Sequence, residues 1–427
     1  MLAARVLADH AETVVVIERD AVGVGSGERR GVPQSSQVHA LLSGGSRQLE
    51  RWFPGFIGRS VAAGASLVPP DRQAVYVDGV RKVRGGDISL LSGTRPFLEG
   101  RIRAELLELP NVKVITGQVT GLEISATAVA AVRYESDGVA GREPADLVVD
   151  AMGRASRLSA WLEEAGWERP PLVRVTTGIN YATAFFHRPP GEHPHGTALA
   201  IPSNMLREEV GGAVFSAVEG DRWIVMMGGY GDFRPGSTAE DMIRRFRTQL
   251  PAPFGHVAAN EMVGDVTTYR QADSRRRDFW ACERLPARLA VVGDAVASFN
   301  PLYGQGMSSA ALHASALSMF LRSGPDLDAP ARDFLALQRV VVDAAWQISA
   351  SEDRTGPGDR TPVGDRMARR IVDLIIQASV TDSAVNAAFQ EVTQMLRHPS
   401  SLAGPRVVWR AWRARKNPRP APTPPLG

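Results

Sequence analysis

The sequence is poor in cysteine, in lysine and in long apolar runs, and each scarcity excludes something. Its 427 residues include one cysteine, Cys282, so an internal disulfide is excluded. No apolar run approaches the ~20 residues that a membrane-spanning helix requires, so no integral membrane segment is expected. The 49 basic and 46 acidic residues give a net charge of +3. Because the basic residues are spread along most of the chain, a dedicated nucleic-acid-binding protein is not predicted.

Several catalytic signatures are also missing. The sequence contains no His-Glu-x-x-His motif, no cysteine pair and no Gly-x-Ser-x-Gly elbow, so neither a metal site nor acyl transfer is predicted. The first residues show no charged segment followed by an apolar core and a cleavage site. Together with the single cysteine, this pattern predicts a reducing, cytoplasmic location. A chain of this length is expected to form two or three structural units around a shared site, and it is long enough for an enzyme.

Residues 1–18 have the pattern of the second half of a strand-helix-strand unit. The end of an apolar helix at residues 1–8 precedes residues 13–18, an apolar strand that ends in Glu18. In a dinucleotide-binding unit an acid at this place hydrogen-bonds the ribose hydroxyls, and a glycine-rich loop lies just before the helix. Glu18 fits, whereas the glycines are absent, so we expect a start codon assigned downstream of the true one. The alternative is a carboxylate that merely ends a buried strand.

Apolar patterning and turn signals divide the chain into three kinds of segment. Buried strands and helices predict a nucleotide-binding domain in three parts, and short alternating strands predict a mostly antiparallel substrate-binding sheet inserted between these parts. The C-terminal part is predicted to be helical, with a basic, proline-rich tail whose last ten residues are disordered. The expected boundaries are 1–68, 94–165 and 271–325 for the nucleotide-binding domain, 69–93 and 166–270 for the sheet, and 326–427 for the C-terminal part.

The most specific segment covers residues 291–309. A buried strand ends in Gly293 and Asp294, and a proline and two glycines then lead into a helix: Pro301, Gly304 and Gly306. An acid at the end of a strand can hold sugar-like hydroxyls, and exposed amides at a helix N-terminus can stabilise an anion. Glycines let this backbone approach a flat ring closely. An ordinary strand-turn-helix is the alternative.

This segment resembles the third FAD fingerprint of the flavoprotein monooxygenases of the aromatic-hydroxylase and squalene-epoxidase superfamily. The resemblance implies an α/β fold: a Rossmann-like FAD-binding domain of the para-hydroxybenzoate-hydroxylase type, with an inserted, mostly antiparallel sheet domain and a helical C-terminal region. It implies that Asp294 binds the ribityl hydroxyls of FAD. It also implies that the turn with Pro301, Gly304, Gly306 and Met307 lies against the flavin ring. The tryptophan-rich signature of the flavin halogenases is absent.

Residues 94–98 are similar to another element of the same family, its Arg-x-x-Leu helix start. This similarity implies that Arg95 reaches FAD between the pyrophosphate and the flavin. A surface salt bridge is the alternative role for this arginine. Pro96 suits the first turn of the helix that we predict over residues 95–109.

Residues 147–157 resemble the family's Asp-Gly fingerprint, which touches FAD and is linked to nicotinamide binding. Met152 stands where the family has aspartate, and this departure resembles a branch that includes the flavin epoxidases of bacterial polyether pathways. Val119 is a further FAD contact that the family resemblance implies.

Residues 29–34 and His39 are similar to a second segment of those epoxidases, Arg-(Arg/Lys)-Gly-Val-Pro-Gln followed by a histidine. The similarity implies that Arg30 and Gln34 contact FAD and that His39 lies beside the flavin. A capping or core role for His39 is the alternative.

The resemblance also implies an activity. In this family NADPH or NADH reduces FAD, which then reacts with O2 to give a flavin hydroperoxide that delivers one oxygen atom to the substrate. The expected substrate is a secondary metabolite, either an olefin that is epoxidised or an aromatic ring that is hydroxylated. The strand pattern suggests Tyr181, Phe186 and Trp223 as cavity-lining residues, with core packing as the alternative.

Three other interpretations stay open. The chain could be a truncated form that binds no flavin, or a flavin-dependent reductase of double bonds. The basic tail between Arg406 and Arg419, with Trp409 and Trp412, could rest on an anionic membrane or a partner. A solvated helix end is the alternative for this tail.

Overall fold

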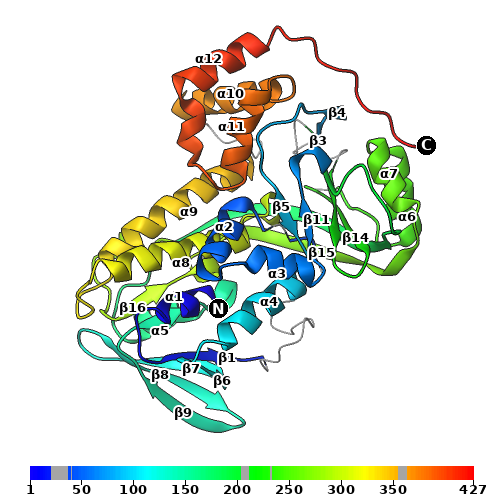
Figure 1. Ribbon diagram of the computed structural model, residues 1–427. Helices are drawn as coiled ribbons and strands as arrows, with labels where there is room; N and C mark the ends of the chain where they lie inside the picture. The colour runs from blue at the N-terminus through cyan, green and yellow to red at the C-terminus, as the bar shows by residue number, and fades with distance from the viewer. Residues whose placement is uncertain (21–36, 40, 203–210, 231–232, 354–362) are drawn as a thin grey trace.

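The computed structural model describes residues 1–20, 37–39, 41–202, 211–230, 233–353 and 363–427. Arg30 and Gln34 therefore lie outside the described residues. Two short parallel strand pairs and a large, mostly antiparallel sheet form the framework, and the C-terminal helices lie at one end of it (Figure 1).

Two separate pairs of parallel strands carry the acids that the sequence places at strand ends. Strand β1 (Val14–Glu18) pairs with β6 (Val112–Thr116), and β10 (Val148–Asp150) pairs with β16 (Leu289–Val291). Within the described residues no strand joins the two pairs. Helix α1 (Leu2–Leu7) packs against α8 (Gly306–Arg322).

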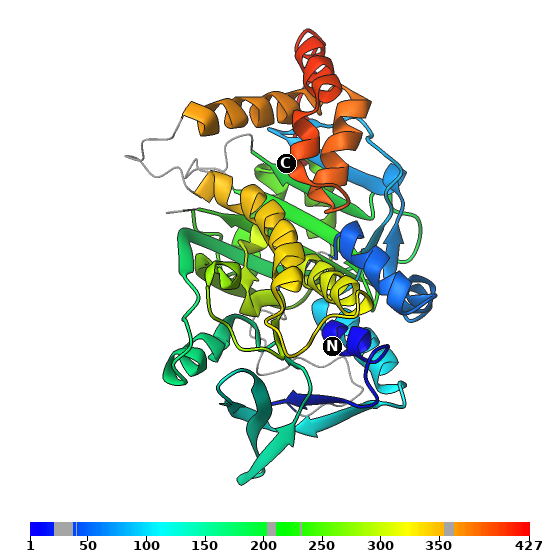
Figure 2. The same cartoon turned by 90° about the vertical axis from the view of Figure 1, so that its left-hand side faces the viewer.

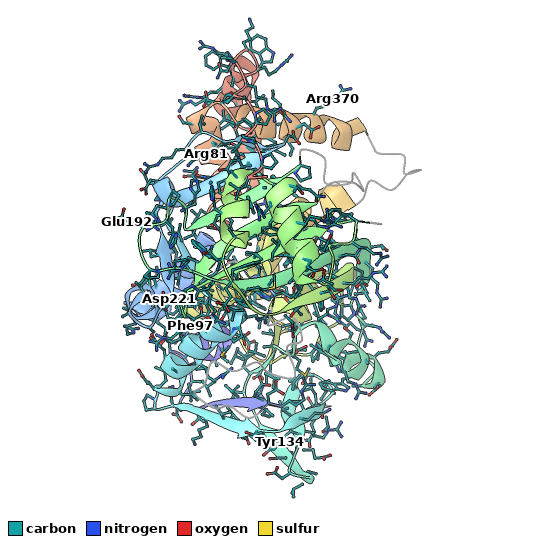
Figure 3. The ribbon with its side chains drawn as sticks, turned by 90° about the vertical axis from the view of Figure 1, so that its right-hand side faces the viewer. Arg81, Phe97, Tyr134, Glu192, Asp221 and Arg370 are labelled. Atoms are coloured by element: carbon teal, nitrogen blue, oxygen red, sulfur yellow. The ribbon has the colours of Figure 1, made fainter. Side chains whose placement is uncertain are left out.

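Three antiparallel strands form a meander that extends from one end of the molecule. They are β7 (Gln118–Ile124), β8 (Val129–Ser136) and β9 (Val139–Pro144). Asp137 and Gly138 both have positive φ, 50° and 77°, which suits the tight two-residue turn between β8 and β9. Figure 3 shows Tyr134 of β8 near one end of the molecule and Arg370 of the C-terminal helices at the other.

The large sheet has eight strands, and its two faces meet different parts of the protein. Helices α6 (Ala239–Thr248) and α7 (Ala252–Ala258) cover one face, where their phenylalanines pack on sheet residues. The opposite face carries Tyr181 and packs against Leu302. In sheet order the strands are β17 (Ala297–Ser298), β15 (Met262–Arg277), β11 (Leu172–His187), β14 (Arg222–Gly229), β13 (Gly212–Val218), β12 (Thr197–Ile201), β3 (Gln73–Val77) and β4 (Val80–Arg81).

Helix α4 (Arg95–Leu107) begins at the residue that the sequence predicts. Thr94 caps it, since its side chain accepts the backbone N–H of Phe97, and Pro96 lies in the first turn. The other elements between β1 and β11 are α2 (Ser43–Trp52), α3 (Phe56–Ala62), β2 (Ser66–Val68), β5 (Leu90–Ser92) and α5 (Leu158–Glu164).

The C-terminal part is helical, as predicted, and Figure 2 shows it stacked beyond the large sheet. Residues 363–393 form two helices, because Asp382 starts the second one by accepting the N–H groups of Ala384 and Val385. The helices are α8 (Gly306–Arg322), α9 (Arg332–Asp353), α10 (Val363–Ala378), α11 (Ser383–Thr393) and α12 (Pro405–Ala414). None of the helices among the described residues is long and apolar enough to cross a membrane.

The last ten residues are placed against the sheet domain, which corrects the prediction of disorder. Thr423 donates its N–H to the carbonyl of Gly79 at 2.8 Å, and Pro424 accepts the N–H of Ala252 at 2.9 Å. Leu426 lies over Gly255, where a Cβ would come within 2.7 Å of it. Composition alone did not reveal this packing, because an extended proline-rich segment carries no periodic apolar pattern.

Candidate functional site

The turn after β16 presents the carboxylate that the sequence singles out. Gly293 adopts φ 63°, a left-handed conformation that favours glycine, and Asp294 follows it half-buried. The Asp294 carboxylate makes no hydrogen bond or ion pair with the described part of the chain. Burial raises the pKa of Asp294, and the charges of Arg95 and Arg154 oppose that rise. This acceptor is therefore available to hydroxyl donors of a ligand.

His313 of α8 holds this turn and was not singled out from the sequence. Its side chain is completely buried, and Nδ1 accepts the N–H of Gly293 at 2.9 Å. Burial lowers the pKa of His313 to about 3. The imidazole is therefore neutral at pH 7, and its Nε2–H points to the Ser309 hydroxyl at 3.4 Å. The only sequence signal is a histidine inside a run of small helical residues.

The turn from Pro301 leads into a helix start without a side-chain cap. The N–H groups of Leu302, Tyr303 and Gly304 are bonded within the turn, and the first N–H groups of α8 meet no capping side chain among the described residues. Asn300 fixes its start, since its side chain accepts the N–H of Leu302 at 3.0 Å and donates to the Tyr230 hydroxyl at 2.7 Å. Gly304 adopts φ 63°, and α8 then begins at Gly306 without a side-chain cap. An uncapped helix N-terminus leaves N–H groups for a ligand that carries negative charge.

Arg95, whose charge acts on Asp294, contacts His39. Nη1 of Arg95 donates to Nε2 of His39 at 3.1 Å, and Nε of Arg95 donates to Glu99 at 2.8 Å. Nδ1–H of His39 donates to the carbonyl of Gln37 at 2.8 Å. Burial, followed by the charge of Arg95, lowers the pKa of His39 to about 4, so this imidazole is neutral at pH 7. The salt bridge named as an alternative for Arg95 is present, with both side chains largely buried.

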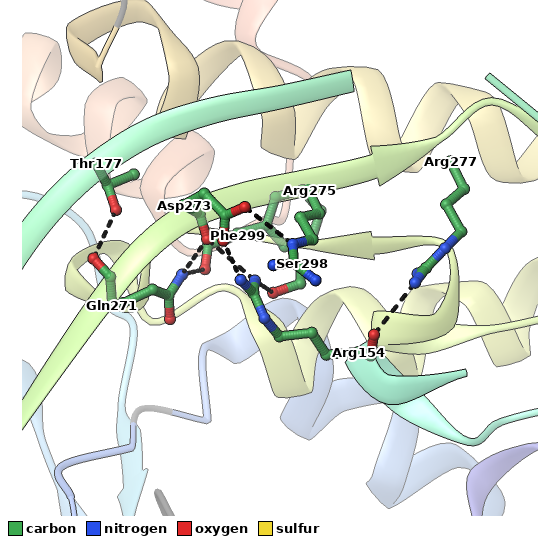
Figure 4. Close-up of polar contacts among 8 residues, drawn as sticks. All are labelled: Arg154, Thr177, Gln271, Asp273, Arg275, Arg277, Ser298 and Phe299. Atoms are coloured by element: carbon green, nitrogen blue, oxygen red, sulfur yellow. Dashed lines mark hydrogen bonds and ion pairs between the residues drawn. The ribbon is translucent and has the colours of Figure 1, made fainter. Parts of the chain in front are cut away.

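A polar network joins the Asp-Gly segment to the large sheet (Figure 4). Arg154 forms an ion pair with Asp273 and donates to the Ser298 hydroxyl at 2.9 Å. Arg275 donates to the other carboxylate oxygen of Asp273 at 2.9 Å. Burial alone would raise the pKa of Asp273, but Arg275 and Arg154 hold it below its ordinary value. Arg277 donates to the carbonyls of Ala295 and Arg154.

Asp150 shows how the segment accommodates Met152. One carboxylate oxygen of Asp150 accepts the N–H of Met152 at 2.9 Å, and the other accepts the hydroxyl of Ser156. Burial raises the pKa of Asp150. The Met152 side chain points outward and is 38% exposed. The backbone of this residue, and not its side chain, therefore shapes the turn.

Glu18 and Val119 lie close together at the end of β1. The carbonyl of Glu18 accepts the N–H of Gly117 at 2.9 Å, and Val119 follows on β7. Glu18 also accepts the N–H of Asp20 at 3.2 Å through its side chain. The roles of both residues in binding FAD remain predictions.

The three aromatic residues suggested for the substrate cavity lie on opposite faces of the large sheet. Phe186 and Trp223 are register partners and belong to the core under α6 and α7. Tyr181 lies on the other face with Met226, Tyr230, Tyr269 and Leu302. The alternating sides of a strand explain this division, because Tyr181 and Phe186 are separated by an odd number of positions. The core interpretation thus fits Phe186 and Trp223, and only Tyr181 faces the Pro301 turn.

Comparisons with known proteins fit this arrangement. No family model matches the chain. Three solved structures share its fold. The p-nitrophenol 4-monooxygenase PnpA from Pseudomonas putida DLL-E4 is 18% identical, with 95% of this chain and 96% of that chain covered and a TM-score of 0.62. A flavoprotein/dehydrogenase from Cytophaga hutchinsonii is 11% identical (97% of this chain and 95% of that chain covered, TM-score 0.67), and the flavin-dependent brominase Bmp2 is 15% identical (96% of this chain and 89% of that chain covered, TM-score 0.57). The protein therefore has the fold of the flavin-dependent monooxygenases and halogenases, which confirms the predicted fold class.

A curated relative shows the family. Protein Rv3254 of Mycobacterium tuberculosis is 32% identical over 339 residues, which cover 76% of this chain and 71% of that protein. The chain belongs to the same family as Protein Rv3254.

Proposed function

We propose that the protein is an FAD-dependent monooxygenase that inserts one oxygen atom from O2 into a small-molecule secondary metabolite. The reaction is epoxidation of an olefin or hydroxylation, with NADPH or NADH as electron donor. The observation that carries the proposal is the half-buried Asp294 carboxylate, which lacks a protein partner in the described structure and precedes a free helix N-terminus. The folds of PnpA and Bmp2 support oxygen chemistry at a flavin. The absent halogenase signature favours oxygen insertion over halogenation.

The residues present fit FAD. Asp294 would accept hydrogen bonds from the ribityl hydroxyls. These bonds would replace the hydrogen bonds to water that the carboxylate loses through burial. The amides of Gly306 and Met307 would stabilise negative charge at the pyrimidine edge, as a helix N-terminus does for anions. Arg95, held by Glu99 and His39, supplies a positive charge that acts on Asp294. When bound, FAD supplies the electron transfer and the activation of O2.

The protein's own part in the reaction is to position the substrate and to exclude water. The sheet face around Tyr181 packs against Leu302 of the turn and carries the apolar side chains of Ile179 and Met226, with the hydrogen-bonded pair of Thr183 and Gln37 on the same face. Such a surface suits an olefin or an aromatic ring and limits water at the reacting atoms. His39 would stay neutral and could hold a proton only at Nδ1, where it donates to Gln37.

Flavin retention after desalting tests the proposal. Asp294→Ala is expected to weaken FAD binding roughly 10- to 100-fold, because the charge-assisted hydrogen bonds of this carboxylate to the ribityl hydroxyls are lost. Asp265→Ala is the matched control, since Asp265 is an exposed acid on β15. Equal FAD binding by both variants would overturn the role of Asp294. No flavin spectrum either in this chain or in a form extended upstream of Met1 would overturn the whole proposal.

Two comparisons separate the remaining candidates. Oxygen uptake that depends on the substrate distinguishes an oxygenase from a reductase of double bonds. The second comparison concerns the flavin-free alternative. In the described structure β1 pairs only with β6, and β16 pairs only with β10. Flavin bound only by a form extended upstream of Met1 would favour the flavin-free alternative for the present sequence.

A further inference from the structure

The outward side of α12 carries large apolar side chains in an unusual setting. Trp409 is 57% exposed and Trp412 is 53% exposed. They stand three positions apart and therefore on the same side of the helix. Ala411 and Ala414 face the opposite way into the core of the C-terminal helices. The helix thus packs on the C-terminal helices through small residues, and its two largest side chains are exposed to solvent.

The charge around these tryptophans has one sign. Residues 392–427 contain no aspartate or glutamate and seven basic residues: Arg397, Arg406, Arg410, Arg413, Arg415, Lys416 and Arg419. The guanidinium of Arg413 lies 4.7 Å from the centre of the Trp409 ring. Arg406, Arg415 and Lys416 are exposed and form no ion pair with the described residues. Arg415 and Lys416 lie in the turn that directly follows α12 (Pro405–Ala414).

This surface is held firmly and stands clear of the rest of the protein. Arg410 is paired with Asp382 at 2.8 Å, which fixes α12 to the start of α11. Beyond α12 the tail is held by Arg419, which pairs with Asp78 at 3.3 Å. In Figures 1 and 2 α12 lies at the outer end of the C-terminal helices, far from the meander.

We propose that α12 docks the protein on the surface of an anionic lipid bilayer. Tryptophan prefers the level of the lipid headgroups, where its ring is buried and its N–H stays hydrated. Arginine and lysine beside it would pair with lipid phosphates, and a basic amphipathic helix lies in the plane of such a surface. A second copy of this chain fits less well, because the same surface on both partners would bring like charges together.

Sedimentation with lipid vesicles tests the proposal on the full chain. Binding is expected to vesicles of phosphatidylcholine with phosphatidylglycerol, and to be much weaker with phosphatidylcholine alone or at high salt. The variant Arg406→Glu with Lys416→Glu is expected to lower the partition coefficient at least about tenfold. The control variant Arg142→Glu with Arg169→Glu makes the same charge change at two exposed positions outside the C-terminal helices and should bind like the natural protein.

The tryptophans give an independent test. Trp409→Ser with Trp412→Ser should weaken vesicle binding and remove most of the fluorescence quenching by brominated lipid. Because both side chains are exposed, thermal unfolding should stay unchanged. Equal binding by the tryptophan and control variants would overturn the proposal, as would no preference for anionic vesicles. Two further results would overturn the proposal. One is self-association, measured by sedimentation velocity, that the tryptophan variant abolishes. The other is binding to nucleic acid in preference to vesicles that the tryptophan variant abolishes.

Discussion

Asp294 and His313 both belong to the turn after β16, but only one of them could be predicted from the sequence. Asp294 could be predicted, because an acid between a buried strand and a glycine-rich helix start forms a local pattern. His313 could not, because its partner Gly293 lies 20 positions away and only the packing of α8 against the turn Gly293–Ala295 brings the two together. The choice between Tyr181 and Phe186 shows the same limit. Alternation predicts that they lie on opposite faces, but not which face meets the Pro301 turn.

His313 makes stability depend on pH in a definite direction. Its pKa is about 3 in the folded protein and about 6.5 when unfolded. Between these values the unfolded chain binds more protons, so the free energy of unfolding falls as pH drops below about 6.5. At pH 5 the loss is about 2 kcal/mol relative to pH 7.

The variant His313→Asn keeps an acceptor for the Gly293 N–H and removes this titration. Its free energy of unfolding, measured by urea titration, should therefore depend less steeply on pH between 5 and 7 than that of the natural protein. The control His256→Asn changes an exposed histidine and should leave the slope unchanged. The same slope in the His313 and His256 variants would contradict a neutral buried imidazole.

Among the elements, those with a local start signal were predictable. Helix α4 begins at Arg95 because Thr94 and Pro96 form a local cap, and β1 covers Val14–Glu18 because its apolar run ends in an acid. The network of Arg154 with Asp273 escaped prediction. The two residues are 119 positions apart, and their contact depends on the register of β15 with β11 and β17. No local pattern contains that register.

Arg154→Gln tests whether this network positions the Asp-Gly segment. The change leaves Asp273 paired with Arg275 alone and removes the bond to Ser298. We expect a loss of about 1–2 kcal/mol in the free energy of unfolding, because hydrogen bonds to charged groups in a partly buried site are lost. The affinity for FAD should fall as well. Arg154→Lys should keep part of the stability and part of the FAD affinity that Arg154→Gln loses.

The control for this variant is Arg157→Gln. Arg157 is exposed and lies near Trp161 without an ion pair in the described structure. Stability and FAD binding should change little. If Arg154→Gln lowered stability but left FAD affinity intact, the network would be structural only.

In the whole molecule, the contact between the sheet domain and the C-terminal helices was the least predictable feature. The N–H of Val83 donates to the carbonyl of Val380 at 3.0 Å, and Asn386 donates to the carbonyl of Val83 at 2.6 Å. These groups are about 300 residues apart in the chain, and one side is irregular backbone. The last ten residues of the chain also contact the sheet domain near this place, where Thr423 donates its N–H to the carbonyl of Gly79. Such contacts follow from tertiary packing alone.

Lys82 lies in this contact and is expected to weaken it. Its side chain is 9% exposed, with Nζ 4.4 Å from the centre of the Phe389 ring, and it forms no hydrogen bond or ion pair with the described residues. Burial lowers the pKa of Lys82 from 10.5 to about 7. The unfolded chain therefore binds more protons between pH 7 and 10.5, and the natural protein gains stability as pH rises through this window.

Lys82→Met should consequently stabilise the protein, because methionine fills the same space without a charge to desolvate. At pH 7 we expect a gain on the order of 4 kcal/mol in the free energy of unfolding, and the gain should shrink as pH approaches 10. Lys113→Met replaces an exposed lysine and serves as the control. A gain that did not change with pH would mean that better apolar packing, and not the removal of a buried charge, stabilises the contact between the sheet domain and α11.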